Sequence, residues 1–337
     1  MKAMVLAAGL GLRMRPLTLL RAKPVLPVLN RPLLEWTMTR LARAGVRNVI
    51  VNLHHLPETV TDVCGTGRRF GLVIRYSDEP VLLGTGGGPR AVGGWFGDEP
   101  LLIVNGDVLF DLDLRRLLAA HGTCGARATL ALRPNPVPYA YSPVVSDRKG
   151  RILSIAGRPA AARGAVSMFA SVHVMDPALL DRLPEGASDS VVDLYIPLLA
   201  EGAHLQGVPS RGAWYDFGRP RLYRDAQLRL LPGRGRDRVL VDGKARVAAT
   251  ARVRRSVVGA GARIAGGARV ERSVLWDGAV VEAGARVSGA IVVTGGVVRS
   301  GEKAQAVIVL PAEALGKPGE AGGRVERRGD MAWVELR

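Results

Sequence analysis

A glycine-rich loop near the N-terminus, followed by two cations, is the part of this sequence best suited to chemistry. The loop spans residues 6–13 and holds Gly9, Gly11 and Arg13, and Lys23 follows a short way along the chain. Glycines after a strand let backbone N–H groups approach phosphates closely. An arginine and a lysine beside them would neutralise a triphosphate as one of its bonds breaks. The spacing therefore favours a triphosphate-binding loop, although a bare Gly-x-Gly is equally typical of a structural turn.

Two familiar phosphate loops do not fit this segment. A P-loop would end in Gly-Lys-Ser or Gly-Lys-Thr, and neither occurs here. A dinucleotide-binding fingerprint would need a third glycine near position 14, which is Met14. The loop is therefore of another type, and its flanking cations are its distinctive feature.

The elements that must position this loop follow an alternating pattern over the first ~230 residues. The short apolar runs that predict buried strands are Ala3–Ala8, Asn48–Leu53, Val73–Tyr76 and Leu101–Val104. Residues 32–44 predict a helix closed by Gly45. This alternation favours an α/β fold, a Rossmann-like and mostly parallel sheet covered by helices on both faces. Because ligands bind beyond the carboxyl ends of such strands, the loops starting at Gly9 and Asn105 are expected on one edge, facing a common cleft.

From about Val239 the pattern changes to a repeat of 17 residues. Val241, Val258, Leu275 and Val292 stand one repeat apart, with two further aliphatic residues and small Gly-Ala corners between successive members. Neither a helix nor an ordinary strand has this period, but the three short sides of a triangular parallel β-helix do. A Gly/Ala-rich linker, the alternative, has no reason to keep the period over four turns. Such prisms commonly pair laterally, so a homo-oligomer formed through this region is expected.

These patterns divide the chain into parts. We expect a catalytic domain over residues 1–232, a hinge at Pro232–Arg236 and a β-helix of 17-residue coils over 239–310. The tail, 311–337, is rich in glycine and is expected to be loosely structured, with one last short strand at Met331–Leu336.

Composition narrows the class of protein. The chain has 47 Lys and Arg against 30 Asp and Glu, a net charge of +17, and 5% aromatic residues. The positive charge is spread along the chain without aromatic interleaving, which argues against a nucleic-acid surface and suits phosphate substrates. Cys64 and Cys124 give no disulfide framework and no metal spacing, and no apolar stretch approaches the ~20 residues of a membrane span. We expect a cytoplasmic protein with no nucleic-acid and no membrane partner.

The whole string from Gly9 to Pro27 resembles the N-terminal signature of the nucleotide-sugar pyrophosphorylases, or sugar-1-phosphate nucleotidylyltransferases. That signature reads roughly G-x-G-x-R-x-x-P-L-T followed by K-P-x-x-P. The resemblance continues through Gly84–Gly87, Asn105–Asp107 and Trp214–Pro220, and covers about residues 1–230. It is greatest to the bacterial branch of mannose-1-phosphate guanylyltransferases and N-acetylmuramate-1-phosphate uridylyltransferases, and a C-terminal left-handed β-helix is usual in many members.

The resemblance implies a reaction and a role for each matching residue. A sugar 1-phosphate would attack the α-phosphorus of an NTP in line and release pyrophosphate. Arg13 and Lys23 would be the catalytic cations, Lys23 acting at the α-phosphate. Asp107 and Asp216 would hold Mg²⁺, whose preferred ligands are hard oxygens. The nucleotide-binding residues would be Leu6, Ala7, Ala8, Gly9, Gly11, Arg13, Gly84, Thr85, Asn105 and Gly106, with Gly84 and Thr85 at the nucleobase.

Each role has a structural alternative. Asp107, after Asn-Gly, could simply cap a turn, and Asp216 could cap a helix that starts near Arg219. Arg13 could be an ordinary surface cation. His54-His55 is a weak candidate for a metal pair, because adjacent residues at a strand end point to opposite faces.

The sequence departs from the family pattern at the expected sugar-phosphate site. Members usually show Glu-Lys-Pro, and the equivalent here is Gly157-Arg158-Pro159. Arg158 can still bind phosphate through its forked guanidinium, whereas Gly157 offers no side chain to a sugar hydroxyl. Tyr141-Ser142-Pro143 also replaces a glycine that often precedes the paired valines. The departures leave open a catalytically inactive subunit that binds nucleotide sugars and regulates a partner.

The substrate pair is expected to be GTP and mannose 1-phosphate, because short uridylyltransferases lack the β-helix tail. UTP or dTTP with another hexose or heptose phosphate remains open, since base choice depends on the loop around residues 79–88. A β-helix acyltransferase is excluded by its need for a histidine beside the helix: all five histidines precede the repeat.

Overall fold

A computed structural model describes residues 1–337 except 136–139, 161–162, 234, 236 and 318. The chain forms two compact units. The first comprises Met1–Gly9 and Leu34–Tyr215, and the second comprises Leu10–Leu33 and Asp216–Arg337. The expected catalytic region 1–232 thus contributes to both units. Two positions of the expected hinge, 234 and 236, lie outside the described residues.

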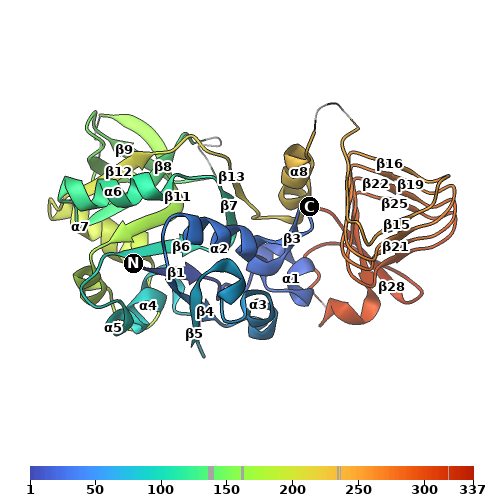
Figure 1. The fold of residues 1–337 in the computed structure, drawn as a ribbon, viewed down its shortest axis with the longest axis horizontal. Helices are drawn as coiled ribbons and strands as arrows, with labels where there is room; N and C mark the ends of the chain where they lie inside the picture. Colours follow the sequence, from blue (N-terminus) through green and yellow to red (C-terminus); the bar gives the residue numbers. More distant parts are fainter. Residues whose placement is uncertain (136–139, 161–162, 234, 236, 318) are drawn as a thin grey trace. The chain divides into compact units, whose positions relative to one another are not determined.

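A nine-stranded sheet organises the first unit (Figure 1). Its parallel half has the order β6-β1-β4-β5 and is formed by β6 (Leu101–Asn105), β1 (Lys2–Leu6), β4 (Asn48–Leu53) and β5 (Val73–Asp78). Its other half is formed by β11 (Ala165–Met175), β9 (Pro143–Ser146), β10 (Ile152–Ile155), β8 (Ala128–Arg133) and β12 (Leu205–Pro209). β11 runs antiparallel to β6, β8 and β9, so the sheet is mixed, with the expected parallel part on one side of β11. The α/β fold class is confirmed.

Helices pack against this sheet. They are α2 (Leu33–Arg43), α3 (Pro57–Cys64), α4 (Gly84–Ala91), α5 (Gly93–Phe96), α6 (Leu114–Cys124) and α7 (Ile196–Ala200), with a π-helical turn at Ser190–Tyr195 before α7. In α2, Leu34, Met38 and Leu41 are fully buried, as their spacing predicts. α4 contacts β1, and α6 contacts β8 and β11. None of the described helices is long and apolar enough to cross a membrane.

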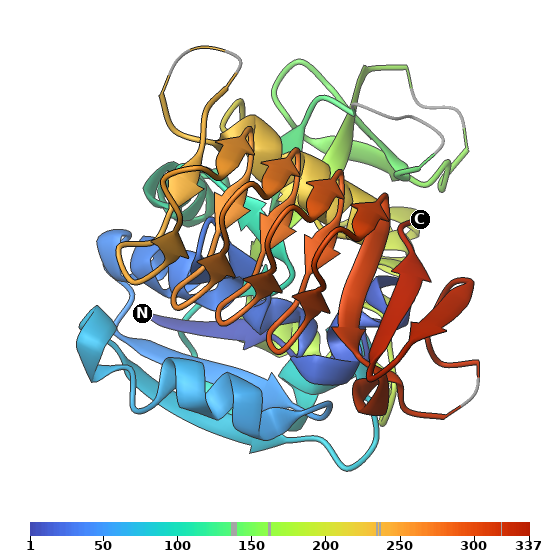
Figure 2. The ribbon, with the colours of Figure 1, turned by 90° about the vertical axis from the view of Figure 1, so that its right-hand side faces the viewer.

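A triangular parallel β-helix forms most of the second unit, and Figure 2 shows its stacked coils. Its sides are β14-β17-β20-β23-β26, β15-β18-β21-β24 and β16-β19-β22-β25. Their bounds are Leu240–Val241, Arg246–Val247, Arg252–Arg254, Val257–Val258, Arg263–Ile264, Arg269–Glu271, Val274–Leu275, Val280–Val281, Arg286–Ser288, Ile291–Val292, Val297–Val298, Lys303–Gln305 and Val307–Pro311, for β14 to β26 in order. Val241 pairs with Val258, Val258 with Leu275, and Leu275 with Val292, so the 17-residue repeat is confirmed.

The C-terminal tail is more ordered than expected. β28 (Met331–Glu335) pairs antiparallel with β26 and with β27 (Val325–Arg328), and Met331 and Trp333 pack into the core of the β-helix. The expected strand at Met331–Leu336 is present and a second strand, β27, precedes it, while the described residues of 316–324 form neither helix nor strand. β28 covers this end of the β-helix with apolar side chains. These residues lie outside the 17-residue repeat, so the repeat does not predict their contact with the β-helix.

The segment Leu10–Leu33 belongs to the same unit as the β-helix. It contains 3₁₀ turns at Leu12–Met14 and Lys23–Val25, α1 (Leu17–Leu20), β2 (Pro27–Val28) and β3 (Arg31–Pro32). α8 (Pro220–Leu230) follows Asp216 in the chain. Such short elements do not hold a shape alone, so their positions depend on packing within the unit.

Candidate active site

The carboxyl ends of β1 and β6 meet at one edge of the sheet. The two strands are parallel neighbours, and Leu6 stands opposite Asn105. The Gly106 N–H donates to the Leu6 carbonyl at 2.8 Å, and a Cβ added to Gly106 would lie 2.9 Å from that oxygen. Only glycine therefore lets the two chains approach this closely. The prediction that the loops beginning at Gly9 and Asn105 leave from one edge is confirmed.

A buried polar network connects the end of β1 to the loop that follows β5. The Ala7 N–H donates to Asn52 Oδ1 at 2.6 Å, and Asn52 Nδ2 donates to Glu79 Oε1 at 2.8 Å. Glu79 Oε2 accepts from the Leu83 N–H at 3.0 Å, directly before Gly84. Sequence reasoning did not single out Asn52 and Glu79, which hold the ends of the predicted loops. The available signal was a polar residue, Asn52, inside the apolar strand β4, because a buried amide must find partners.

The loop expected at the nucleobase is fixed from a distant part of the first unit. Gly84 has φ +75, and an added Cβ would lie 2.5 Å from the Ser188 carbonyl oxygen. The Thr85 hydroxyl donates to Asp189 Oδ2 at 3.0 Å and accepts from the Ser190 N–H at 2.9 Å. Asp189 also caps the turn that starts at Ser190. The Thr85 side chain is thus used to shape the loop, so backbone groups of Gly84 and Thr85 are the ones suited to a base.

The predicted phosphate loop enters the second unit at Leu10. Gly11 has φ +61, and an added Cβ would lie 2.7 Å from Thr18 Cγ2 and 3.3 Å from Lys23 Cβ. The Thr18 hydroxyl donates to the Gly11 carbonyl at 3.0 Å. Glycine is therefore required by both conformation and space. Arg13 lies exposed in the turn Leu12–Met14.

Two predicted site residues from distant parts of the chain meet in the second unit. Lys23 Nζ lies 3.5 Å from Asp216 Oδ1, and the side chains are 9% and 20% exposed. A partly buried ion pair holds the ammonium in place. Asp216 is the last residue of β13 (Trp214–Asp216), and it does not act as the N-cap of α8, where Arg219 stands. The capping alternative for Asp216 is therefore excluded.

The predicted magnesium ligands have donor atoms of the type that the ion prefers. Asp107 and Asp216 both offer carboxylate oxygens, and a Cβ on Gly218 would lie 3.2 Å from Asp216 Oδ2, so glycine keeps that side of the carboxylate open. Among the described residues, no three His, Cys, Asp or Glu side chains gather as an ion site. Magnesium typically binds one or two carboxylates and completes its shell with substrate phosphates and water. Each aspartate therefore offers donors of a kind that Mg²⁺ accepts alongside phosphate oxygens.

The predicted sugar-phosphate residue lies in a tight turn of the first unit. Ile155 and Arg158 exchange two backbone hydrogen bonds, each 2.9 Å, around Ala156 (φ +52) and Gly157 (φ +75). Two successive residues with positive φ are typical of a two-residue hairpin turn, and glycine suits the second position. Gly157 is thus explained by the turn, and the Arg158 side chain is exposed.

Other polar groups of the structure lie elsewhere or are occupied. His54 Nδ1 is 2.7 Å from the Glu79 carbonyl oxygen, and burial raises the pKa of the Cys64 thiol to about 12.

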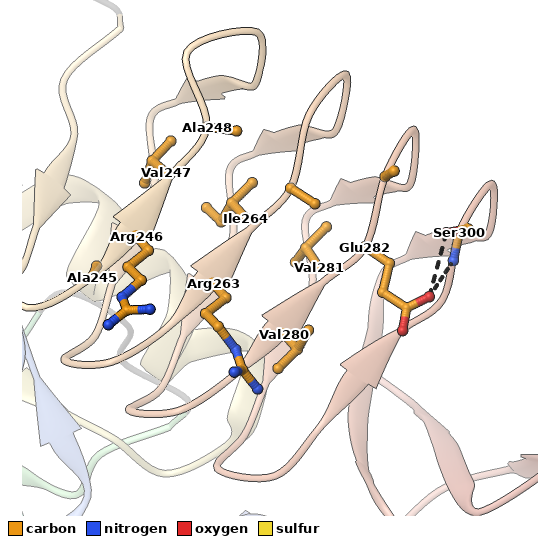
Figure 3. A pocket seen from close by; sticks show the side chains of 12 residues that line it. Ala245, Arg246, Val247, Ala248, Arg263, Ile264, Val280, Val281, Glu282 and Ser300 are labelled. Atoms are coloured by element: carbon orange, nitrogen blue, oxygen red, sulfur yellow. Dashed lines mark hydrogen bonds between the residues drawn. The ribbon is translucent and has the colours of Figure 1, made fainter.

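A groove of about 770 Å³ lies on the β15-β18-β21-β24 side of the β-helix (Figure 3). Its lining includes Arg246, Arg263 and Glu282, and none of the predicted site residues. The groove is therefore separate from the candidate active site.

Comparisons with known proteins find two family matches along the chain. Residues 2–232 match the Nucleotidyl transferase family, and residues 237–307 match the family "GlmU-like, C-terminal hexapeptide". The chain is 32% identical over 234 residues to a UTP–glucose-1-phosphate uridylyltransferase of Synechocystis sp., covering 65% of this chain and 60% of that protein. It is 34% identical over 220 residues to a mannose-1-phosphate guanylyltransferase of Mycobacterium tuberculosis, covering 65% and 61%.

A third relative is shorter. An N-acetylmuramate alpha-1-phosphate uridylyltransferase of Neisseria meningitidis serogroup B is 35% identical over 236 residues, which cover 67% of this chain and 97% of that protein. The matched region spans only about 60% of the Synechocystis and M. tuberculosis proteins. With a family match across residues 2–232 and the fold described above, the chain belongs to the nucleotidyl transferase family.

Proposed function

We propose that the protein transfers a nucleoside monophosphate from an NTP to a sugar 1-phosphate and releases pyrophosphate. One observation carries the proposal: buried Lys23 lies beside Asp216 and next to Gly11, whose positive φ and close neighbours favour glycine. A lysine held in one position can stabilise the negative charge that builds up on a phosphate in the transition state. The named activities of the three relatives, all transfers of nucleotidyl groups to sugar 1-phosphates, support the same reaction.

In the proposed reaction a phosphate oxygen of the sugar 1-phosphate forms a bond to the α-phosphorus of the NTP. The bond from that phosphorus to the β-phosphate oxygen breaks, and pyrophosphate leaves with the electron pair. The Lys23 ammonium neutralises charge at the α-phosphate, while Arg13 and the backbone N–H groups at Gly9 and Gly11 bind the leaving phosphates. Bound Mg²⁺, held by Asp107 and Asp216, would supply further positive charge. No covalent intermediate is needed, so catalysis rests on positioning.

For the substrates we propose GTP and mannose 1-phosphate, with Arg158 at the sugar phosphate. The similarity to the M. tuberculosis guanylyltransferase supports this pair. So does the length of the Neisseria uridylyltransferase, 97% of which is matched by only 67% of this chain. The hexapeptide family match suggests oligomerisation, and we propose that copies associate through the β-helix, which light scattering on the purified protein would test.

The experiment that tests the function is pyrophosphate release by the full chain with Mg²⁺, across four NTPs and a panel of sugar 1-phosphates. Release with one pairing, dependent on both substrates and on the metal, would establish the reaction and identify the product. Release with UTP or dTTP instead of GTP would keep the reaction and replace the substrate pair.

The exposed Arg158 and the turn at Gly157 favour one competing function, a regulatory subunit with a defective sugar-phosphate site. It predicts no release with any pairing but a rise in melting temperature with nucleotide sugars. In that outcome, replacing Gly157-Arg158 by Glu-Lys is the next experiment, because restored release would place the defect at this turn.

A further inference from the structure

The β-helix departs from its own repeat at the third coil. After the interior residues of the neighbouring coils come small or aliphatic residues, Gly259-Ala260 and Val293-Thr294. The third coil instead has Trp276-Asp277, and Trp276 is the one aromatic residue in the sequence from 239 to 310. Trp276 is only 1% exposed. A bulky polar-tipped residue at a position otherwise filled by small ones must be explained by what it contacts.

Trp276 contacts the segment that carries Lys23. Its indole N–H donates to the Tyr223 hydroxyl at 3.1 Å, and this hydroxyl donates to the Pro27 carbonyl at 2.5 Å. Tyr223 is fully buried, and burial raises the pKa of its hydroxyl well above the usual value, so it stays a donor. The chain of two hydrogen bonds fixes the backbone on the C-terminal side of Lys23.

Asp277 fixes the chain on the N-terminal side of Lys23, through Arg21. Arg21 Nη2 donates to both carboxylate oxygens of Asp277, at 2.8 and 2.9 Å, and to the Thr294 hydroxyl at 2.9 Å. The Arg21 guanidinium also lies 5.1 Å from the centre of the Trp276 ring. Charge-assisted hydrogen bonds together with a cation–π contact make this a stronger tie than a simple surface ion pair.

Two further hydrogen bonds extend the attachment along the segment. The Leu29 N–H donates to Gln227 Oε1 at 2.9 Å, and Asn30 Nδ2 donates to the Val258 carbonyl at 2.8 Å. Lys23 itself lies in a turn of three residues, too short to be rigid alone. Its position is therefore set by α8 and by the second and third coils of the β-helix.

We propose that Trp276, Asp277 and Tyr223 are positioning residues for Lys23, so that the β-helix is part of the catalytic apparatus as well as a module for association. The proposal rests on the function proposed above. Reactions that depend on positioning are sensitive to displacements of about 1 Å, which can lower the rate on the order of 100-fold. Weakening either attachment, the hydrogen bonds through Trp276 and Tyr223 or those of Asp277 to Arg21, is therefore expected to slow the chemical step. The binding of the sugar phosphate should stay unchanged.

The test compares Trp276→Phe and Asp277→Asn with a matched ion-pair control in the same unit, Asp330→Asn, which removes the carboxylate bonded to Arg299. The measurements are kcat, KM for each substrate, and amide hydrogen exchange over residues 19–31. We expect both test variants to lower kcat by about 10- to 100-fold, to keep KM for the sugar phosphate, and to exchange faster in this segment. The control should match the wild type in all three.

A charge swap separates positioning from general destabilisation. Arg21→Asp combined with Asp277→Arg should recover kcat relative to Asp277→Asn, since it restores the tie with its polarity reversed. Should Trp276→Phe fail to fold, Asp277→Asn and the swap still decide, because the Asp277 carboxylate is 45% exposed. Test variants with kcat within twofold of the wild type and unchanged exchange would overturn the proposal.

Failure of the proposed function gives a different result. A wild type that releases no pyrophosphate with any substrate pair defeats the function, and hydrogen exchange over residues 19–31 then tests the attachment alone. Faster exchange in Asp277→Asn would support the hold on the segment, and unchanged exchange would overturn it.

Discussion

At the scale of single residues, the proposed site depends on a lysine that a partly buried ion pair holds in place. Lys23 is 7% exposed and ion-paired to Asp216, whereas Arg13 is exposed and available to a ligand. A lysine held in a partly buried position is suited to stabilise the negative charge that develops on a substrate phosphate during the reaction. The two cations therefore have different expected roles, Lys23 in the reaction step and Arg13 in binding.

Replacing Lys23 by Met tests the first role, since methionine keeps most of the apolar stem and removes the ammonium. We expect kcat to fall by roughly 100- to 1,000-fold, the usual loss when one preorganised charge at a transition state is removed. Lys244→Met, at an exposed position of the β-helix, is the control and should keep wild-type turnover. Near-wild-type turnover in a folded Lys23→Met protein would remove Lys23 from the mechanism.

A buried histidine should make the first unit sensitive to acid. His173 is 2% exposed and hydrogen-bonded to Tyr195, and burial lowers its pKa from 6.5 to about 3. Below about pH 6.5 the His173 side chain binds a proton in the unfolded chain but not in the folded chain. The free energy of unfolding should therefore fall as pH drops from 6.5 toward 3, by at most about 1.4 kcal/mol per pH unit from this group.

Urea unfolding between pH 7.5 and 4.5 checks this prediction. His173→Asn should be less stable at pH 7.5 but show a flatter fall with acid, because the group that protonates on unfolding is gone. His204→Asn, at a partly exposed histidine, should keep the wild-type slope. Identical slopes in wild type and His173→Asn would contradict the assignment.

At the scale of elements, the two glycines of the phosphate loop differ in what they tolerate. A Cβ on Gly11 would meet Thr18 and Lys23 in a left-handed conformation, whereas a Cβ on Gly9 would meet nothing within 4 Å. From the sequence motif alone, the two glycines would be expected to tolerate a side chain equally. Their difference arises from the fold and gives a matched pair of variants.

Gly11→Ala should lower the melting temperature and turnover together, since the left-handed backbone alone costs about 1–2 kcal/mol for alanine. Gly9→Ala should melt like the wild type and raise KM for the NTP, because its methyl would occupy the space through which phosphate approaches. Calorimetry and steady-state kinetics on both variants measure the two effects. A Gly9→Ala protein with an unchanged KM would place the phosphates elsewhere.

One side of the β-helix carries a ladder of like charges. Arg252, Arg269, Arg286 and Lys303 stand opposite one another in successive strands, and all four are exposed. Like charges directly opposite in a sheet are destabilising. We expect Arg269→Glu to raise stability by a few tenths of a kcal/mol, through pairing with Arg252 and Arg286, and Arg269→Gln to raise it less. Thermal unfolding at low and high salt checks this, since the gain should shrink with salt.

At the scale of the whole molecule, the regular parts could be predicted from sequence. The strands around Asn48–Leu53 and Leu101–Asn105 and the 17-residue coils follow from periodicity, which local chemistry dictates. The hairpin that closes the β-helix could not, since Met331 and Trp333 meet their partners only in the folded chain.

The site shows the same limit. Residue types and resemblance name the glycine loop, Lys23 and the aspartates as candidates. They do not predict the network from Ala7 through Asn52 to Glu79, nor the hydrogen bond of Thr85 to Asp189. Those contacts join residues far apart in sequence, and no spacing rule links them. The grouping of Leu10–Leu33 with the β-helix is likewise a property of packing.

Nucleotidyl transfer by the Lys23 site can be tested by product analysis of a single reaction. The full chain is incubated with Mg²⁺, GTP and mannose 1-phosphate, and GDP-mannose and pyrophosphate are measured by mass spectrometry and a coupled assay. We expect equal amounts of the two products, reversal to GTP on addition of excess pyrophosphate, and almost no product with Lys23→Met. Formation of inorganic phosphate or GMP instead, or equal product from Lys23→Met, would show that the proposed chemistry is wrong.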